Sequence, residues 1–368
     1  MGHQVVSVEW EGRSVDAFVP ALLASYGEPG TAAMRAVARA EGALEAAVAL
    51  DPRLEIPARL LLRAEGVASS RIEAINAPAE LVALADRDPS IGGPAAWVAG
   101  NLRAVDAALA HWGPLTTHLL FDWHRVLMAT SDLDPAHVGA WRDRLGWVGG
   151  PTPHRAAHVA APPDRIADLM ADLVAYANGT AHDPVTQAAL VHAQFETIHP
   201  FADGNGRLGR ILIGWLLRRR LGTTAPPPVS VAFLRDVGGY LAGLTLFRTD
   251  GPDRWVAWFA ATLERAAIDA GRTLADITDL ARSWPERITD LRADAAAHRL
   301  IPLLLEHPAV DVSAVVELLG VSAPAARNAV HVLVEREVLR PADIAGAGVA
   351  GRVRHWWVAG ELLDLLAR

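Results

Sequence analysis

The stretch HPFADGNGRLGR, residues 199–210, decides how the middle of this chain folds. A helical pattern of apolar residues, PVTQAALVHAQFETI (184–198), precedes it, and a second one, RLGRILIGWLLRRRLG (207–222), follows it. His199 closes the first helix, and Pro200 ends it because proline cannot continue the hydrogen-bond ladder. The sequence therefore predicts two helices joined by the short loop FADGNG.

A glycine-rich turn that leads into a helix N-terminus is a natural anion site. The first backbone N–H groups of the helix have no intrahelical partner, and the helix dipole places positive charge there. Gly204 and Gly206 allow the tight backbone and the close approach of phosphate oxygens. Arg207, which we expect to open the helix, and Arg210 lie three residues apart and so share one face. The pattern predicts a phosphate-binding site.

Two further residues of the stretch suggest chemistry at that phosphate. Asp203 is one carboxylate, and magnesium commonly binds through one or two carboxylates together with substrate phosphates. His199 can take a proton from an attacking hydroxyl near neutral pH. A helix-capping histidine or a tight turn is usually structural when it stands alone. Their joint occurrence within twelve residues favours transfer of a phosphoryl group to a hydroxyl.

The same stretch resembles the signature of Fic-domain (filamentation induced by cAMP) proteins at every defined position, and the resemblance extends over about residues 30–260. It implies an all-α core with a short β-hairpin flap, and a magnesium-dependent protein adenylyltransferase that moves AMP from ATP to a Ser, Thr or Tyr hydroxyl. By this resemblance His199 is the general base, Asp203 holds Mg²⁺, Arg210 binds the γ-phosphate and Phe201 packs beneath the loop. Four consecutive residues would bind the α- and β-phosphates: Gly204, Asn205, Gly206 and Arg207.

The resemblance also implies roles for two more residues, Gly206 and Tyr240. A related group that phosphorylates its targets carries lysine at the position of Gly206, so glycine here favours AMP transfer. Tyr240 is expected to flank the adenine.

The segment SSRIEAIN (69–76) is similar to the inhibitory helix that one class of Fic proteins carries before the core, placed here around residues 66–78. Ser69 and Glu73 match that pattern, whereas Ala74 stands where the class has Gly or Asn. A glutamate that reaches Arg210 would occupy the guanidinium that the γ-phosphate needs. We expect autoinhibition by Glu73, and the alternative is an ordinary exposed carboxylate on an amphipathic helix. Ala74 puts only fine geometry in doubt, since alanine suits a helix interior.

The segment WVGGPTPHRAAHVAAP (147–162) predicts a short hairpin. The resemblance to Fic proteins implies that it is a flap on which a target protein docks as an added strand, and the alternative is an ordinary loop that covers helix ends. Its two histidines, His154 and His158, are expected to be solvated loop residues because no carboxylate accompanies them.

The remaining sequence suggests four parts: an N-terminal helical region (1–95), the Fic core (96–222), a helical extension (223–292) and a C-terminal winged helix (293–368). From His298 onward there are seven arginines against eight acidic residues, so the basic excess of a DNA-binding domain is missing. Whether this part binds DNA, a protein or a second copy in a homodimer stays open.

Composition limits the other functions. The 368-residue chain has no cysteine, which excludes disulfides and thiolate catalysis. All 34 basic residues are arginine, so a Walker-type phosphate loop and Schiff-base chemistry are excluded. The net charge of −8 argues against non-specific nucleic-acid binding. The N-terminus lacks the pattern of a signal peptide, no apolar run spans a membrane, and we expect a cytoplasmic protein.

The sequence thus predicts an ATP-using adenylyltransferase, restrained by Glu73, that modifies a target protein and, in vitro, itself. Two alternatives remain: removal of AMP at the same site, and a nucleotide-sensing transcriptional regulator that uses the winged helix.

Overall fold

The computed structural model describes residues 3–48, 55–88, 90–342 and 355–367, and it is mainly helical with three small antiparallel sheets. The α-helices are α1 (Thr31–Val48), α2 (Glu55–Ile72), α3 (Ala79–Ala85), α4 (Gly93–Ala110), α5 (Thr117–Met128), α6 (Pro163–Asn178), α7 (Pro184–Ile198), α8 (Asn205–Leu221), α9 (Val229–Arg235), α10 (Val237–Asp250), α11 (Pro252–Glu286), α12 (Ala296–Leu300), α13 (Val312–Leu319), α14 (Ala323–Glu335) and α15 (Gly360–Leu366). The strands are β1 (Gln4–Trp10), β2 (Arg13–Val19), β3 (Trp147–Val148), β4 (His158–Val159), β5 (Ala309–Val310), β6 (Arg340–Pro341) and β7 (Trp357–Val358).

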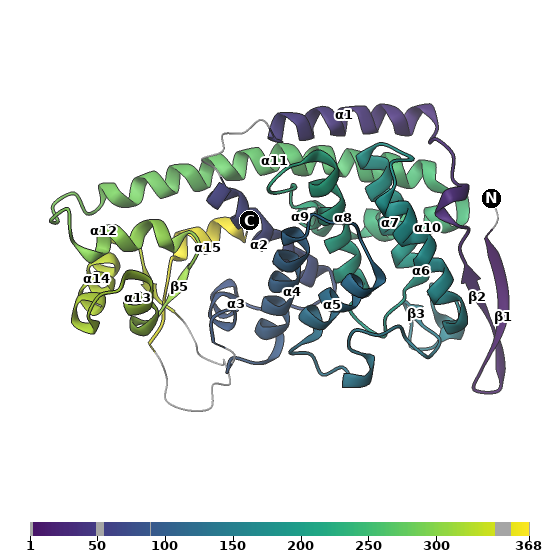
Figure 1. Ribbon diagram of the computed structural model, residues 1–368, viewed down its shortest axis with the longest axis horizontal. Helices are drawn as coiled ribbons and strands as arrows, with labels where there is room; N and C mark the ends of the chain where they lie inside the picture. The colour runs from purple at the N-terminus through teal and green to yellow at the C-terminus, as the bar shows by residue number, and fades with distance from the viewer. Residues whose placement is uncertain (1–2, 49–54, 89, 343–354, 368) are drawn as a thin grey trace.

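The molecule is elongated, and α11 runs along most of its length (Figure 1). Helix α1 lies beside α11, the helices α4 to α8 and α10 fill the middle, and β1 and β2 form one end. Among the described residues no single helix combines the length and apolar character needed to cross a membrane; the bent pair α9 and α10 meets both criteria only jointly.

The centre of the largest hydrophobic core is α7, every residue of which from Val185 to Ile198 is buried. The helix begins where the Asp183 side chain accepts a hydrogen bond from the Thr186 N–H at 2.8 Å, with Pro184 in the first turn. Helix α8 packs along it and ends at Gly222, which has the left-handed conformation (φ 67°) that glycine adopts without strain. These two helices hold the ends of the loop 199–204 in fixed positions.

Helix α2 ends earlier than predicted. It has Pro57 in its first turn, where a missing N–H costs nothing. It stops at Ile72, so the inhibitory segment expected around 66–78 is helical only in its first half.

Two hairpins lie at one end of the molecule. The predicted flap is present, because β3 pairs with β4 and Trp147 lies opposite Val159. The N-terminal hairpin of β1 and β2 contacts the flap: β2 lies next to β4, and the Trp10 and Trp147 rings meet edge-to-face at 6.0 Å between centroids.

The C-terminal part contains the predicted order of elements, with α13 and α14 followed by the antiparallel strands β6 and β7. Most of the wing expected between these strands falls on residues 343–354, outside the described residues. The core of this part begins on α11 with Ile277 and Trp284 and also includes Leu60 of α2, so hydrophobic contacts cross the domain boundary drawn at residue 293.

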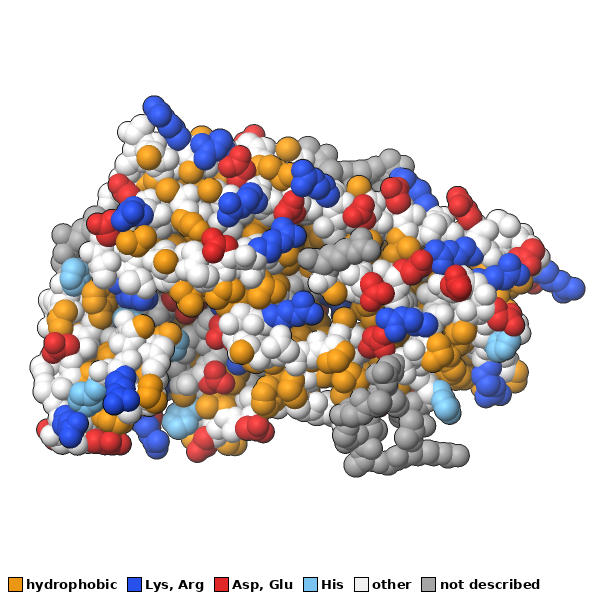
Figure 2. All heavy atoms as spheres, turned by 180° about the vertical axis from the view of Figure 1, so that it is seen from behind, with side chains coloured by type: hydrophobic (Ala, Val, Ile, Leu, Met, Phe, Trp, Pro, Cys, Tyr) orange, Lys and Arg blue, Asp and Glu red, His pale blue; other side chains and the backbone are white. Residues whose placement is uncertain are grey.

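Arginine and acidic side chains are interspersed over the face of the molecule in Figure 2, including its C-terminal end. DNA binding by this part therefore stays an open prediction, without a single-sign surface on the visible described residues to favour it.

Candidate functional site

The loop 199–204 leads into α8, whose first backbone N–H groups have no intrahelical partner. Gly204 is in the left-handed conformation (φ 77°), and the first bond of α8 runs from the Leu208 N–H to the Gly204 carbonyl at 3.0 Å. The N–H groups of Asn205, Gly206 and Arg207 therefore precede the intrahelical ladder and can bind an anion. The helix begins two residues before the predicted start at Arg207 because Asn205 and Gly206 already form its first turn.

The side chain of Asn205 fixes the shape of the loop. Its Oδ1 accepts from the Phe201 N–H and its Nδ2 donates to the Phe201 carbonyl, both at 2.8 Å. Because the residue is only 2% exposed, its contribution to phosphate binding is limited to the backbone N–H, which narrows the predicted role. Phe201 is fully buried beneath the loop and stacks on His124 with 4.0 Å between ring centroids.

His199 lies at the C-terminus of α7 in the left-handed conformation (φ 49°), half-buried beside the anion site. Burial and then the charge of Arg142 lower its pKa to about 4, while the Glu73 carboxylate opposes this more weakly. At pH 7 the imidazole is therefore neutral and able to accept a proton. Its Nδ1 is buried without a hydrogen-bond partner among the described residues.

Arg142 holds the loop of His199 against the flap, a role that the sequence did not reveal. Its Nε donates to the His199 carbonyl at 2.8 Å, and its Nη2 donates to the carbonyls of Ile198 and Ala161. Its backbone N–H also bonds the Pro200 carbonyl at 2.9 Å. The only signal was an arginine just before the flap in WRDRLGW, a pattern common on exposed loops.

Asp203 stands at the mouth of the site with its side chain 59% exposed. Its Oδ1 accepts from the Gly204 N–H at 2.6 Å, and its Oδ2 lies 3.6 Å from Arg207. Below it, His124 bonds the Asp203 carbonyl at 3.0 Å and accepts from the Gly139 N–H at 2.8 Å. An exposed, oriented carboxylate beside open N–H groups suits a hydrated divalent cation with phosphate ligands. No cluster of three or more His, Asp or Glu ligands occurs among the described residues.

The two arginines of the motif take different partners. Arg207 extends toward Met128 and Asp203, and its buried Nε has no partner among the described residues. Arg210 is 1% exposed and extends to α2, where its Nε donates to the Ser69 hydroxyl at 2.9 Å and its Nη2 to the Ser69 carbonyl at 2.8 Å.

Glu73 completes the environment of Arg210. Its Oε1 accepts from Arg210 Nη2 at 2.8 Å, and its side chain remains 39% exposed at the mouth of the site. Burial raises the pKa of Glu73, but the Arg210 guanidinium outweighs it and leaves that pKa below its ordinary value. A Cβ at Gly206 would lie 2.0 Å from Glu73 Oε1, so only glycine there leaves space for this contact.

The prediction that Ala74 lies in a helix interior is wrong, because this residue lies in the turn that positions Glu73. Ala74 is not in a helix interior but has φ 58°, the left-handed conformation that favours Gly or Asn. The Ile75 N–H bonds the Ser70 carbonyl and the Ala74 N–H bonds the Arg71 carbonyl, at 3.0 and 2.9 Å, which is the Schellman ending of a helix. Alanine thus strains the turn that positions Glu73.

Tyr240 does not flank an open nucleotide site, contrary to prediction. It is 2% exposed, with its ring stacked on Phe233 at 4.7 Å between centroids. Its hydroxyl bonds His192 at 2.9 Å and accepts from Arg210 Nη1 at 3.5 Å. No ring face is left for adenine, and the residue instead supports Arg210 from behind.

The two flap histidines differ. His154 is exposed, as expected, whereas His158 is buried and bonds the Thr197 carbonyl at 2.9 Å, so the expectation of a solvated residue is wrong for it. Burial, followed by Arg248, lowers the pKa of His158 to about 3, and the neutral ring joins the flap to the end of α7.

Sequence reasoning also missed Glu196, one turn before His199. It is buried against Gly209, where a Cβ would lie 2.4 Å from its Oε1, and burial raises its pKa to about 8 despite the nearby Arg210. Its position in AQFETI, among apolar core residues, was the available signal.

Fold and site together define a helical protein built around an anion-binding helix N-terminus with an adjacent neutral histidine. Residues 114–217 match the Fic/DOC family model. The protein adenylyltransferase Fic of Drosophila erecta is 33% identical over 134 residues, which are 35% of this chain and 24% of that protein. Its counterpart in Drosophila ananassae is 32% identical over 133 residues. The match thus spans about a quarter of the length of these relatives.

Solved structures share the fold. A Fic family protein from Desulfovibrio desulfuricans G20 has a TM-score of 0.56 and 24% identity, covering 91% of this chain and 99% of that one. Fic-1 from C. elegans has a TM-score of 0.53 and 18% identity, covering 67% of this chain and 73% of that one. At these identities the likeness concerns the fold alone.

Replacing Ala74 by glycine should stabilise the turn that carries Glu73. We expect Ala74→Gly to raise the free energy of unfolding by about 0.5–1 kcal/mol, because glycine removes the left-handed strain. Ala58→Gly, in the interior of the same helix, should lower it by about 1 kcal/mol. Urea unfolding of both variants checks the prediction, and the same sign for both would contradict it.

Proposed function

We propose that this protein is an adenylyltransferase that transfers AMP from ATP to a hydroxyl of a target protein. The observation that carries the proposal is His199, a neutral, half-buried imidazole directly beside the open N-terminus of α8. The names of the curated relatives support the same activity.

The reaction needs one bond formed and one broken at the α-phosphorus. The target hydroxyl loses its proton to His199 while its oxygen bonds the α-phosphorus. The bond from that phosphorus to the bridging oxygen of the β-phosphate breaks, and pyrophosphate leaves with the electron pair. The N–H groups of Asn205, Gly206 and Arg207, with the Arg207 guanidinium, stabilise the charge on the phosphate oxygens.

Asp203 would hold Mg²⁺, which supplies charge neutralisation on the phosphates when bound. The fit rests on its exposed carboxylate, which the Gly204 N–H and Arg207 orient at the mouth of the anion site. The protein's own part is to present this oxygen and to leave the remaining positions to phosphate and water.

Glu73 restrains the activity by occupying Arg210. A buried guanidinium must keep an anionic partner, and either the glutamate or the γ-phosphate can provide it. With the 2.8 Å ion pair in place, ATP would bind without its γ-phosphate on Arg210 and in an unproductive pose.

The target segment is proposed to add to the flap at β3. Strand β4 pairs with β3 on one side and lies next to β2, while no second strand of the described residues pairs with β3. An extended target peptide could therefore complete the sheet at that edge and present its hydroxyl to His199.

A second function, removal of AMP, has one observation in its favour. The Glu73 carboxylate interacts electrostatically with His199, as an arrangement of carboxylate and base for positioning water would require. Incubating wild type with an AMP-modified target and following release of AMP distinguishes this reaction from transfer.

Relief of autoinhibition should be visible with ATP labelled at the α-phosphate. Glu73→Gly with magnesium should retain at least ~10-fold more label on protein than wild type, because Arg210 becomes available to the γ-phosphate. The double variant Glu73→Gly/His199→Ala should bind ATP but retain no label. Label from the γ-phosphate in place of the α-phosphate would overturn AMP transfer, and equal labelling of wild type and Glu73→Gly at saturating ATP would overturn autoinhibition.

The pH dependence of the transfer rate should reflect the protonation of His199. Because its pKa lies near 4, the base is unprotonated above about pH 5, and transfer by Glu73→Gly should stay level from pH 6 to 8. Activity should fall only at lower pH, as the imidazole binds a proton. Removing the Glu73 carboxylate lowers this pKa further, so a midpoint near 6.5 in Glu73→Gly would contradict the assignment.

Magnesium dependence should depend on Asp203. In the Glu73→Gly background, Asp203→Asn should raise the magnesium concentration for half-maximal transfer by about tenfold or more, since a neutral amide is a poorer ligand. Asp168→Asn, at an exposed carboxylate on α6, serves as the matched control and should behave like the parent. Transfer that survives EDTA would exclude the metal.

A further inference from the structure

Helix α3 lies between the core and the C-terminal part of the molecule (Figure 1). It packs on α4 of the core and on β5 and α15 of the C-terminal part. With seven residues and no side-chain cap at its start, α3 is far shorter than a helix that is stable alone in water. Its position therefore depends on both of these neighbours.

A hydrophobic cluster, here called the α3 cluster, joins α3 to both parts. Its buried members are Ala83, Leu84 and Ala85 of α3, Ile91, Ala95 and Ala99 on or just before α4, and Ala309, Trp356, Val358 and Leu363 of the C-terminal part. Trp356 is the largest of these side chains and is only 7% exposed. The C-terminal part thus supplies much of the apolar surface that covers α3.

Two polar contacts connect α3 to the same part. Arg340 of β6 forms an ion pair with Glu80, in the first turn of α3, whose side chain is 14% exposed. Arg340 also lies 3.6 Å from Asp364 of α15. Just beyond the other end of α3, Arg87 donates a hydrogen bond to His307 Nδ1 at 3.0 Å. Both ends of this short helix are therefore attached to the C-terminal part.

The C-terminal part is itself fixed to the long helix α11. The Glu361 carboxylate of α15 accepts hydrogen bonds from Trp284 Nε1 at 3.1 Å and from Arg287 Nη2 at 3.0 Å. Trp284 is also buried in the hydrophobic core of the C-terminal part, while Trp255 and Phe259, near the start of α11, are buried in the core around α7. Helix α11 is therefore a frame against which α15 holds α3.

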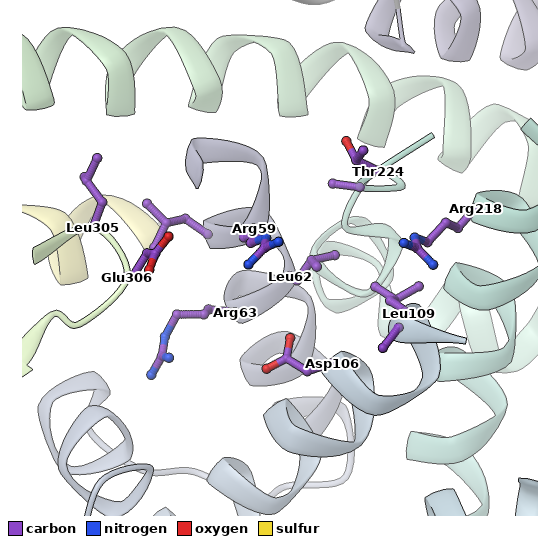
Figure 3. A pocket seen from close by; sticks show the side chains of 12 residues that line it. Arg59, Leu62, Arg63, Asp106, Leu109, Arg218, Thr224, Leu305 and Glu306 are labelled. Atoms are coloured by element: carbon purple, nitrogen blue, oxygen red, sulfur yellow. The ribbon is translucent and has the colours of Figure 1, made fainter. Parts of the chain in front are cut away.

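The core and the C-terminal part are not packed closely along their whole boundary. A cavity of about 460 Å³ lies between them, and its lining includes Arg59 of α2, Arg218 of α8 and, from the C-terminal part, Leu305 and Glu306 (Figure 3). The boundary is closed where the α3 cluster lies, and α3 follows Glu73 directly in the chain.

The segment 74–78 joins Glu73 to α3. Ile75 and Ala77 pack in a small cluster with Val82 of α3 and with residues of α2 and α4, and Ala77 also packs against the α3 cluster. Glu73 lies just past the end of α2, so the turn that follows it sets where its carboxylate points. This turn is thus held at one end by α2 and at the other by α3.

Ala74 places the turn under strain. Its φ of 58° belongs to the left-handed conformation, which is unfavourable for alanine. Such strain persists only while the surrounding structure holds both ends of the turn in place. A less firmly held α3 would let Ala74 return to an ordinary conformation and would move Glu73 away from Arg210.

We propose that the C-terminal part regulates the motif through α3: by holding this helix, it keeps the strained turn closed and Glu73 on Arg210. A partner that draws the C-terminal part away from α3 releases the glutamate and relieves autoinhibition. The consequence for activity rests on the proposed function, in which Glu73 and the γ-phosphate compete for Arg210. The mechanical connection between the C-terminal part and the turn does not.

Hydrogen exchange of the full chain tests this connection without any nucleotide. Arg340→Gln breaks the ion pair with Glu80, and Leu363→Ala leaves a cavity in the α3 cluster. Each should raise the exchange rate of the backbone N–H groups of residues 69–78 by about threefold or more, because the turn opens more often.

Arg336→Gln is the matched control for Arg340→Gln. Arg336 belongs to the same part and forms an ion pair of similar exposure, but its partners are Asp290 at 2.6 Å and the Arg287 carbonyl, not α3. This variant should leave the exchange rate of residues 69–78 within about twofold of wild type.

The effect on Arg210 is measured by isothermal titration calorimetry, as the Kd for ADP divided by the Kd for ATP, because only ATP carries a γ-phosphate. Arg340→Gln should raise this ratio about threefold over wild type and Leu363→Ala about tenfold, whereas Arg336→Gln should leave it unchanged. In the Glu73→Gly background neither substitution should raise the ratio further, because the carboxylate that it releases is gone.

Ala74→Gly should counteract these substitutions. Glycine removes the strain that opposes the closed turn, so the double variant Ala74→Gly/Arg340→Gln should return the ADP-to-ATP ratio to within about twofold of wild type. A double variant with a higher ratio than Arg340→Gln alone would contradict the role of the strained turn.

The outcomes separate this inference from the proposed function. Unchanged exchange of residues 69–78 in both Arg340→Gln and Leu363→Ala would overturn the inference. A ratio that rises in Glu73→Gly but in neither of these variants, or that they raise equally in the Glu73→Gly background, would overturn it as well. Faster exchange in a protein whose Glu73→Gly variant binds ADP and ATP alike would refute the proposed competition at Arg210 and leave the connection through α3 standing.

Discussion

The buried charge of Arg210 is the constraint on which the other features of the site depend. Its side chain is 1% exposed, and an unpaired guanidinium at that depth would cost several kcal/mol. Burial lowers its pKa, but Glu73, Tyr240 and Glu196 reverse that effect and the pKa lies above its ordinary value. The protein therefore keeps a permanent cation beneath an anion-binding helix, and this cation needs an anionic partner at all times. The autoinhibition proposed above rests on this requirement, since the glutamate and a phosphate could each satisfy it and would exclude one another.

The helices that hold this charge also limit how the site can change. Helix α7 is buried along its length, and Arg142, His124 and Asn205 fix the loop between α7 and α8 by hydrogen bonds to its backbone. The motif is thus rigid. Helix α2 is held as well, because Glu65 accepts hydrogen bonds from Ser230 of α9 and the Gly66 carbonyl accepts one from Asn101 of α4. The strained Ala74 lies just past its end, beside Glu73.

Sequence and structure agree closely within the motif because the motif is local. Glycines at 204 and 206, a proline at 200 and flanking helical patterns specify the loop with little help from other segments. Agreement weakens where a role depends on distant partners. Tyr240 was assigned to adenine by its aromatic type, but the ring lies behind Arg210 and is covered by Phe233. His158 was expected in solvent, but the flap folds onto α7 and buries it. Ala74 was placed in a helix interior, but α2 ends at Ile72 and the turn falls on the alanine.

The sequence by itself determined the helical class, the flap and the anion-binding turn with its histidine, aspartate and arginines, because residue type and spacing along one chain are enough to form them. The resemblance to the inhibitory helix of Fic proteins, carried by Ser69 and Glu73, also named Glu73 as the partner of Arg210. Only the tertiary structure decided which groups are neutral and which are charged, since burial and neighbours from other helices set the pKa values of His199 and Glu196. It alone placed Arg142 under the loop and Arg218 across a cavity from Arg59, because contacts between residues more than fifty positions apart depend on how the helices pack.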